Sequence, residues 1–159
     1  MKIVEGDLLY MFASHEFDVI IHGCNCFHLM GAGIAGQIAK QYPQAYLTDI
    51  KSSEKGEKSK LGWWTSCDVN EDNLDQDSQW VINLYTQFYP GRVDPDELYK
   101  TIKIGFDRLM RTGLLKGKRV GIPVIGGGIA GGDYNKLVEI FKTKSESHGI
   151  DLTVVVLPF

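Results

Sequence analysis

Two glycine-rich segments carry the pattern G-x-G-x-x-G, which lets a protein backbone approach a phosphate closely. One segment extends from Gly31 to Gly36 and the other from Gly126 to Gly131. Each lies between an apolar run that predicts a strand and a segment that predicts a helix. Free N–H groups and the helix dipole attract anions at such a position, and glycine has no side chain to obstruct them. Two such loops at one edge of a sheet could hold a diphosphate between them.

The context of these loops argues against a dinucleotide-binding enzyme. That fold needs a βαβ unit after the glycines and an acidic residue at the end of the next strand. After Gly131 the sequence predicts one helix and one strand, and Asp151 lies at the start of that strand. In the first copy, the polar residues 25–30 separate the strand from the glycines. Neither copy is followed by Gly-Lys-Ser/Thr, which excludes a Walker loop.

Polar residues follow the apolar run 19–24. His22 lies near the carboxyl end of this predicted strand, where α/β proteins place their ligands. Asn25 follows at the mouth of the first glycine loop, and its amide can both donate to and accept from sugar hydroxyls. Cys24 and Cys26 could form a zinc site with His22 or His28, but one C-x-C without a second cluster favours packing thiols. We therefore expect no metal and no cofactor.

The elements that must position these residues are six strands alternating with helices. The helix predicted at 94–112 opens with an aspartate and a proline, and its apolar residues recur at three- and four-residue steps. The acidic stretch 70–79 predicts a surface loop. The alternation favours an α/β sandwich with a mainly parallel or mixed sheet. Strands are predicted at 2–4, 19–24, 61–67, 80–88, 119–125 and 152–157, and further helices at 33–42, 44–51 and 133–148.

Length and composition limit the protein class. The chain has 159 residues, of which 43% are hydrophobic, so we expect a single domain over residues 1–159. The sequence has no apolar run of membrane-spanning length and its amino terminus lacks a signal-peptide layout, so we expect a cytoplasmic protein with reduced thiols. A formal net charge of −3 offers no long-range attraction to nucleic acid. We expect a monomer with no nucleic-acid or membrane partner.

Three motifs together resemble the macro domain family of ADP-ribose-binding proteins, over nearly the whole chain. They are Val4-Glu5-Gly6-Asp7-Leu8, the loop from Gly31 to Ala35, and the loop from Pro123 to Gly131. The resemblance implies a three-layer α/β/α sandwich with a mixed, mainly parallel six-stranded sheet. The sequence is most similar to the branch that contains the yeast ADP-ribose-1″-phosphate phosphatase. That branch shares the stretch from Ile21 to Cys26 and a Tyr-Pro-x-Ala turn, here Tyr42 to Ala45.

The resemblance also implies roles for individual residues. Asp7 would accept a hydrogen bond from the adenine amino group, with the Leu8 backbone beside it. Asn25 would contact the distal ribose. His22 and Asp133 would lie near the anomeric carbon as catalytic residues, although Asp133 could equally cap the last helix. The residues expected around the diphosphate and distal ribose are Gly31, Ala32, Gly33, Ile34, Ile125, Gly126, Gly127, Gly128, Ile129 and Ala130.

The activity that the resemblance implies is removal of the 1″-phosphate from ADP-ribose 1″-phosphate. His22 would attack phosphorus or protonate the leaving oxygen. Two alternatives use the same pocket: hydrolysis of ADP-ribosyl-glutamate or O-acetyl-ADP-ribose, and binding of ADP-ribose without chemistry. A related glutamate hydrolase uses a lysine on its fourth strand as a nucleophile, but this chain has Gln87 there. An amide cannot form a Schiff base, so that covalent mechanism is not expected.

Overall fold

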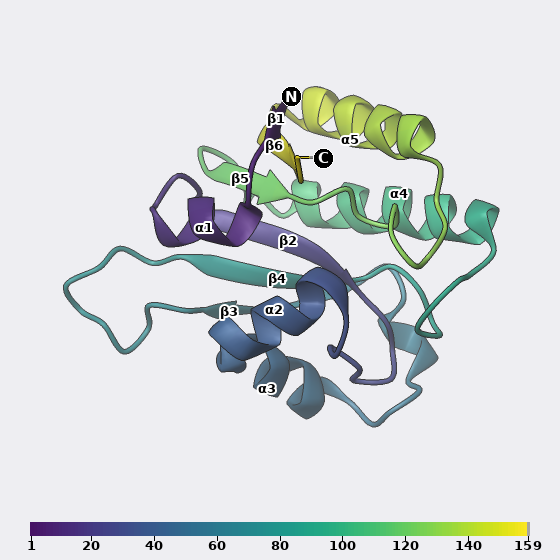
Figure 1. Cartoon of the computed structure of the whole chain (residues 1–159), viewed down its shortest axis with the longest axis horizontal. Helices are drawn as coiled ribbons and strands as arrows, with labels where there is room; N and C mark the ends of the chain where they lie inside the picture. The colour runs from purple at the N-terminus through teal and green to yellow at the C-terminus, as the bar shows by residue number, and fades with distance from the viewer. Residues whose placement is uncertain (159) are drawn as a thin grey trace.

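A six-stranded sheet forms the centre of the protein. The computed structural model describes residues 1–158 (Figure 1). The strand order is β1-β6-β5-β2-β4-β3, and every neighbouring pair is parallel except β3 and β4. The mixed, mainly parallel sheet is therefore confirmed. The strands are β1 (Lys2–Glu5), β2 (Val19–Cys24), β3 (Trp64–Asp68), β4 (Trp80–Tyr85), β5 (Arg119–Ile122) and β6 (Asp151–Val156).

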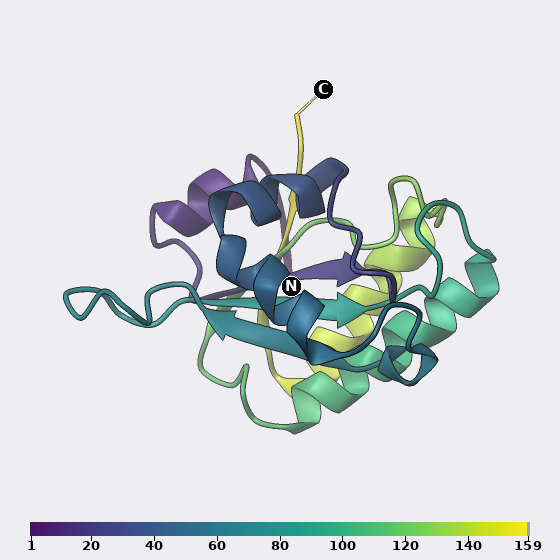
Figure 2. The same ribbon diagram turned by 90° about the horizontal axis from the view of Figure 1, so that it is seen from below.

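Helices cover both faces of the sheet (Figures 1 and 2). One apolar cluster joins the sheet to α4 (Pro95–Arg111) and α5 (Tyr134–His148). A second cluster joins the other face to α1 (Leu8–Ala13), α2 (Gly33–Gln41) and α3 (Pro43–Ser52). A short 3-10 helix, η1 (Lys58–Lys60), follows α3. The result is the expected three-layer α/β/α sandwich. Among the helices of residues 1–158, none is long and apolar enough to cross a membrane.

The longest helix forms for the reasons that its sequence suggests. The Asp94 side chain accepts a hydrogen bond from the backbone N–H of Glu97, and Pro95 occupies the first turn. Leu98, Ile102 and other residues of the predicted stripe are buried against the sheet. Side chains three and four residues apart share one face of a helix, so the spacing of these residues fixes which side of α4 packs inward.

Two strands end earlier than the sequence suggests. The apolar run 80–88 forms β4 only as far as Tyr85, and the run 119–125 forms β5 only as far as Ile122. Beyond these points the apolar side chains belong to loops. The register pairs Cys24 with Tyr85, so β2 and β4 end level and their following loops leave the sheet together. The helix α1 was not predicted, because six residues are too few to show a helical repeat.

Candidate functional site

A cleft of about 500 Å³ lies at the carboxyl ends of β2, β4 and β5. Parallel strands with level ends bring their following loops together, and α/β proteins bind ligands at this edge. The cleft brings together both glycine loops and the segment after β4. Its lining comprises Gly23, Cys24, Asn25, Leu29, Gly31, Ala32, Gly33, Ile34, Ala35, Thr86, Gln87, Pro90, Gly91, Pro123, Val124, Ile125, Gly126, Gly128, Ile129 and Ala130.

Backbone N–H groups are the available hydrogen-bond donors of both loops. The helix α2 begins at Gly33 with no side-chain cap, so its first N–H groups have no partner in the described chain. The tight turns of the second loop use the N–H groups of Gly127 and Gly131. Within residues 1–158, no protein acceptor meets the backbone N–H groups of Gly33, Ile34, Ala35, Gly128, Ile129 and Ala130. Six donors from two loops therefore line one cleft.

Several glycines leave open space beside the backbone of this cleft. A Cβ atom built on Gly31 or Gly128 would meet no atom within 4 Å. Of the described residues that line the cleft, none is a lysine or arginine. An anion bound here would be held by backbone dipoles rather than by a cationic side chain.

Asn25 lines the cleft, but its amide is used within its own loop. Its Oδ1 accepts hydrogen bonds from the backbone N–H groups of Phe27 at 2.9 Å and Leu29 at 3.4 Å. Its Nδ2 donates to the Leu29 carbonyl at 2.9 Å. The same loop holds His28 at a φ of 59°, a left-handed conformation that is uncommon for a residue with a side chain. The structure therefore shows that Asn25 shapes its own loop, while the expected contact to a sugar stays a prediction.

His22 does not line the cleft. Its side chain is fully buried, and its Nε2 lies 2.6 Å from the Asn83 Oδ1. An amide oxygen only accepts, so Nε2–H donates to it. Burial lowers the pKa of His22 to about 4, although the hydrogen bond to the Asn83 oxygen acts in the opposite direction. The structure therefore shows a structural role for His22 between β2 and β4, while the expected catalytic role stays a prediction.

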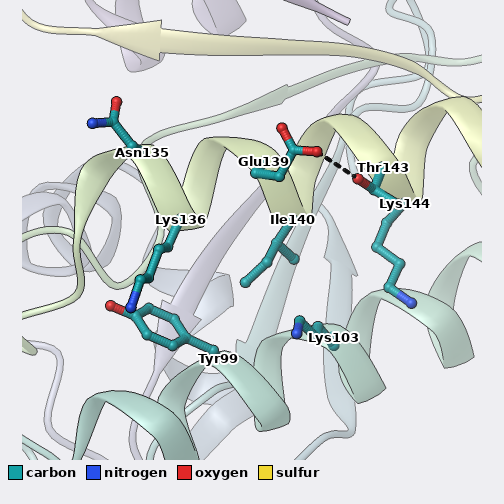
Figure 3. A pocket seen from close by; sticks show the side chains of 8 residues that line it. All are labelled: Tyr99, Lys103, Asn135, Lys136, Glu139, Ile140, Thr143 and Lys144. Carbon is teal, nitrogen blue, oxygen red and sulfur yellow. Dashed lines mark hydrogen bonds between the residues drawn. The ribbon is translucent and has the colours of Figure 1, made fainter.

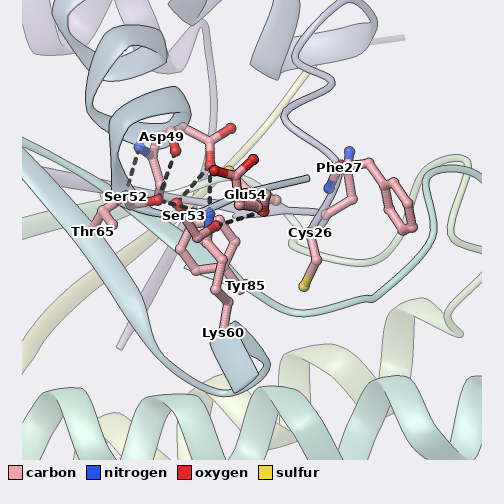
Figure 4. Close-up of polar contacts among 12 residues, drawn as sticks. Cys26, Phe27, Asp49, Ser52, Ser53, Glu54, Lys60, Thr65 and Tyr85 are labelled. Atoms are coloured by element: carbon pink, nitrogen blue, oxygen red, sulfur yellow. Dashed lines mark hydrogen bonds and ion pairs between the residues drawn. The ribbon is translucent and has the colours of Figure 1, made fainter. Parts of the chain in front are cut away.

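The partner of His22, Asn83, belongs to a buried polar network between the sheet and α3. Figure 4 shows the part of this network around Thr65, Tyr85 and Asp49. The Asn83 Nδ2 donates to the carbonyl of Ala45 on α3 at 3.0 Å and to the Thr65 hydroxyl at 3.1 Å. Thr65 in turn lies 2.8 Å from the hydroxyl of Tyr85. The network joins three neighbouring strands to one helix.

An ion pair completes the network. Asp49 on α3 accepts hydrogen bonds from the Tyr85 hydroxyl at 2.7 Å and from the Lys60 ammonium at 3.2 Å. The Lys60 ammonium also donates to the Ser52 hydroxyl at 2.8 Å. Asp49 is only 1% exposed and Lys60 only 8%. Neither charge stands out in the sequence, because Asp49 lies within the predicted helix 44–51 and Lys60 ends the charged segment 51–60, which is typical of a solvated connector.

Asp133 is the N-cap of α5. Its side chain accepts from the Lys136 N–H at 3.0 Å, and its own N–H donates to the Tyr99 hydroxyl at 2.8 Å. The residue is exposed and does not line the cleft. Of the two roles considered for Asp133, the geometry supports the cap.

Replacement of Asp133 by alanine should lower the free energy of unfolding by about 1 kcal/mol, the usual effect of losing an aspartate cap. Urea denaturation measures the change. Asp133→Asn should retain most of the stability, because asparagine is an equally good cap. A loss of less than a few tenths of a kcal/mol in the alanine variant would contradict the assignment.

Asp7 also caps a helix and lies at a distance from the cleft. Its side chain accepts from the Tyr10 N–H at 3.1 Å, and Leu8 is buried in the core. Asp7 follows β1, which is four strand spacings from β4 in the sheet, or about 19 Å. Asp7 and Leu8 therefore lie at the same sheet edge as the cleft, beyond one of its ends.

A larger hollow of about 620 Å³ lies elsewhere, between the outer surfaces of α4 and α5 (Figure 3). Lys103, Lys136 and Lys144 line it together with Glu139. Lys144 is paired with Asp107 at 2.8 Å. Neither glycine loop lines this hollow, and its mixture of positive and negative side chains is typical of a solvated helix surface. We assign it no site.

The three cysteines are free thiols, and Cys24 and Cys26 are buried. Burial raises the pKa of Cys24 well above its ordinary value and that of Cys26 to about 11. Both are therefore protonated thiols at neutral pH, which are poor nucleophiles and poor metal ligands. Within residues 1–158, no group of three or more His, Cys, Asp or Glu side chains is placed to hold a metal ion.

Comparison with known proteins identifies the fold family. The Macro domain family model matches residues 21–141, which is more than half of the chain. The chain belongs to the macro domain family. This macro domain is 34% identical over 145 residues to an uncharacterized 17.5 kDa protein from the tk-vs intergenic region of Enterobacteria phage T4, covering 91% of this chain and 90% of that protein. The family resemblance is thus confirmed, while the closer relationship to the yeast phosphatase branch stays a prediction.

Solved structures show the same fold at lower sequence identity. The macrodomain of Mycobacterium tuberculosis DarG superposes with a TM-score of 0.78 at 22% identity, covering 99% of this chain and 98% of that one. Thermosipho africanus DarTG, solved in complex with ADP-ribose, gives a TM-score of 0.77 at 16% identity and covers 97% of this chain and 40% of that one.

Proposed function

We propose that this macro domain binds ADP-ribose in the cleft between its two glycine loops. The proposal depends on the six backbone N–H groups of the two loops, which lack acceptors in the described chain. A diphosphate offers several charged acceptors, and backbone donors satisfy them without a cation. The ADP-ribose complex of the structurally similar Thermosipho africanus protein supports the choice of ligand.

The sheet order supports an orientation for the ligand. Asp7 lies beyond one end of the cleft, after β1, and the segment after β4 forms the other end. With adenine near Asp7, as the family resemblance implies, the diphosphate would lie between the glycine loops and the distal ribose near Thr86 and Gln87. The separation of about 19 Å suits an extended nucleotide sugar.

We further propose a specific activity, removal of the 1″-phosphate from ADP-ribose 1″-phosphate. This proposal depends on the sequence motifs and not on the cleft geometry. The cleft offers no strong nucleophile to support it, because the Cys24 thiol stays protonated and His22 is closed off. Any hydrolysis would therefore use bound water positioned by the cleft. Phosphate release from the 1″-phosphate by the purified protein, compared with its turnover of O-acetyl-ADP-ribose and ADP-ribosyl-glutamate, tests this activity. Binding of ADP-ribose with no turnover of any of the three would leave a non-catalytic binding module.

Substitution of Gly128 by glutamate should weaken ADP-ribose binding at least 30-fold in calorimetry. A Cβ atom at this position would meet no protein atom within 4 Å, and Gly128 lines the cleft, so we expect the glutamate side chain to enter the cleft without disturbing the core. Its carboxylate would repel the diphosphate and occupy its space. The melting temperature should stay within about 2 °C of the wild-type value, because nothing in the fold is displaced.

A matched control is Gln76→Glu, which adds the same charge on the exposed loop at the far end of β3 and β4. This variant should bind ADP-ribose within twofold of the wild type. Equal binding by the wild type and Gly128→Glu would show that the ligand does not use this cleft. If the wild type did not bind ADP-ribose, the proposed function itself would be wrong.

A further inference from the structure

Gln87 lies between two cavities. It follows the carboxyl end of β4, is half-buried, and lines the cleft described above. It also lines a smaller cavity of about 250 Å³ on the other side of the segment, together with Thr86 and Phe88. Gln87 therefore forms part of the wall between the two cavities, at the end of the cleft that follows β4.

Hydrogen bonds fix the orientation of this amide. The Nε2 atom donates to the carbonyl oxygens of Tyr89 at 2.8 Å and Gly91 at 2.9 Å. Two carbonyl acceptors require the NH₂ group on that side, so the amide cannot be turned around. Both amide hydrogens are used. No donor of the described chain binds the remaining oxygen, Oε1.

The free oxygen differs from the other polar groups of the cleft. The glycine loops present N–H donors, which suit phosphate oxygens. Asn25 has the other amide side chain in the lining, and its oxygen already accepts two hydrogen bonds from its own loop. A sugar hydroxyl must donate as well as accept, and the Gln87 Oε1 is an amide acceptor that is still available to it.

We propose that the Gln87 Oε1 accepts a hydrogen bond from a hydroxyl of the distal sugar, so that Gln87 distinguishes ADP-ribose from ADP. The inference rests on the proposed function and on the ligand orientation given there. The carbonyls of Tyr89 and Gly91 hold the amide in place before the ligand arrives, so little side-chain freedom is lost on binding. ADP, which lacks this sugar, makes no contact with Gln87.

Calorimetry with ADP-ribose and ADP on Gln87→Met tests this role. Methionine has a similar length but neither donates nor accepts as an amide does. The dissociation constant for ADP-ribose should rise about fivefold, the usual contribution of one neutral hydrogen bond. The constant for ADP should change less than twofold. Gln76→Met, a change of the same kind on the remote exposed loop, should alter neither value.

Gln87→Met also removes the two hydrogen bonds that the amide donates to the carbonyls of Tyr89 and Gly91. A second variant must therefore separate loss of the Oε1 acceptor from a change in the loop 87–91. Gly91→Ala keeps Gln87 but strains the loop, since Gly91 has a φ of +89° and its Cβ would meet nothing within 4 Å. An equal selective loss of ADP-ribose affinity in this variant would assign the effect to the loop and overturn the role of Oε1. Equal weakening of both ligands by Gln87→Met, or no weakening, would also overturn it. Failure of the wild type to bind ADP-ribose would instead remove the proposed function.

Discussion

Replacement of Asp49 by alanine should lower the free energy of unfolding by about 3–5 kcal/mol, measured by urea denaturation at pH 7. Asp49 is only 1% exposed and is the counter-ion of the Lys60 ammonium. Its removal leaves a buried cation without a partner and also removes an acceptor of the Tyr85 hydroxyl. Loss of one partner of a buried pair is far more costly than the net contribution of the pair itself, because the remaining charge stays desolvated.

Two further variants isolate the cause of this loss. The double variant Asp49→Ala/Lys60→Met should recover much of the stability, because no unpaired charge is then buried. Asp18→Ala removes an aspartate paired with Arg119 at 2.9 Å, but that pair is partly exposed. Its loss should cost at most about 1 kcal/mol. The buried-charge explanation fails if Asp49→Ala costs no more than Asp18→Ala, or if the double variant is no more stable than the single one.

This ion pair has a structural connection to the cleft. Asp49 lies on α3, and α3 directly follows α2, whose amino end carries the first group of free N–H donors. Bonds from α3 to β4 and η1 hold this helix pair against the sheet. The polar network therefore helps to fix the position of α2, whose amino end carries these donors.

The fold and the cleft could be predicted from local sequence signals. Alternating strands and helices, the Asp94-Pro95 cap and the stripe on α4 are all properties of neighbouring residues. The two glycine loops could be placed at one cleft because parallel strands align their carboxyl ends. Each of these inferences needs only residue type, short spacing and one rule of sheet geometry.

The side-chain roles could not be predicted in the same way. His22 binds Asn83, which is 61 residues away, and β2 is buried on both faces. A strand with apolar residues on both sides does not show which face a given side chain occupies. Asn25 and Asp133 bond within their own segments, so residue type alone allows either a local or a ligand-binding role. The three-dimensional structure shows the local role of both residues, which residue type alone could not predict.

His22 should make the stability of the protein depend on pH between about 4 and 6.5. Its pKa is about 4 in the folded protein, because burial disfavours the charged ring, against 6.5 in the unfolded chain. Between these values the unfolded chain binds the extra proton, so stability falls as the pH is lowered. The slope approaches about 1.4 kcal/mol per pH unit, and the total loss is roughly 3 kcal/mol.

A comparison of wild type and His22→Gln over this pH range separates the contribution of one ring from all other titrating groups. Glutamine can still donate to the Asn83 oxygen but does not titrate, so its curve of unfolding free energy against pH should be flatter by that slope. Asp18 and Asp107 have pKa values below their ordinary range and are present in both proteins, so their effects cancel in the difference. Parallel curves would show that the ring is protonated in the folded state or reaches solvent. Either result would contradict the neutral, closed-off state of the His22 ring.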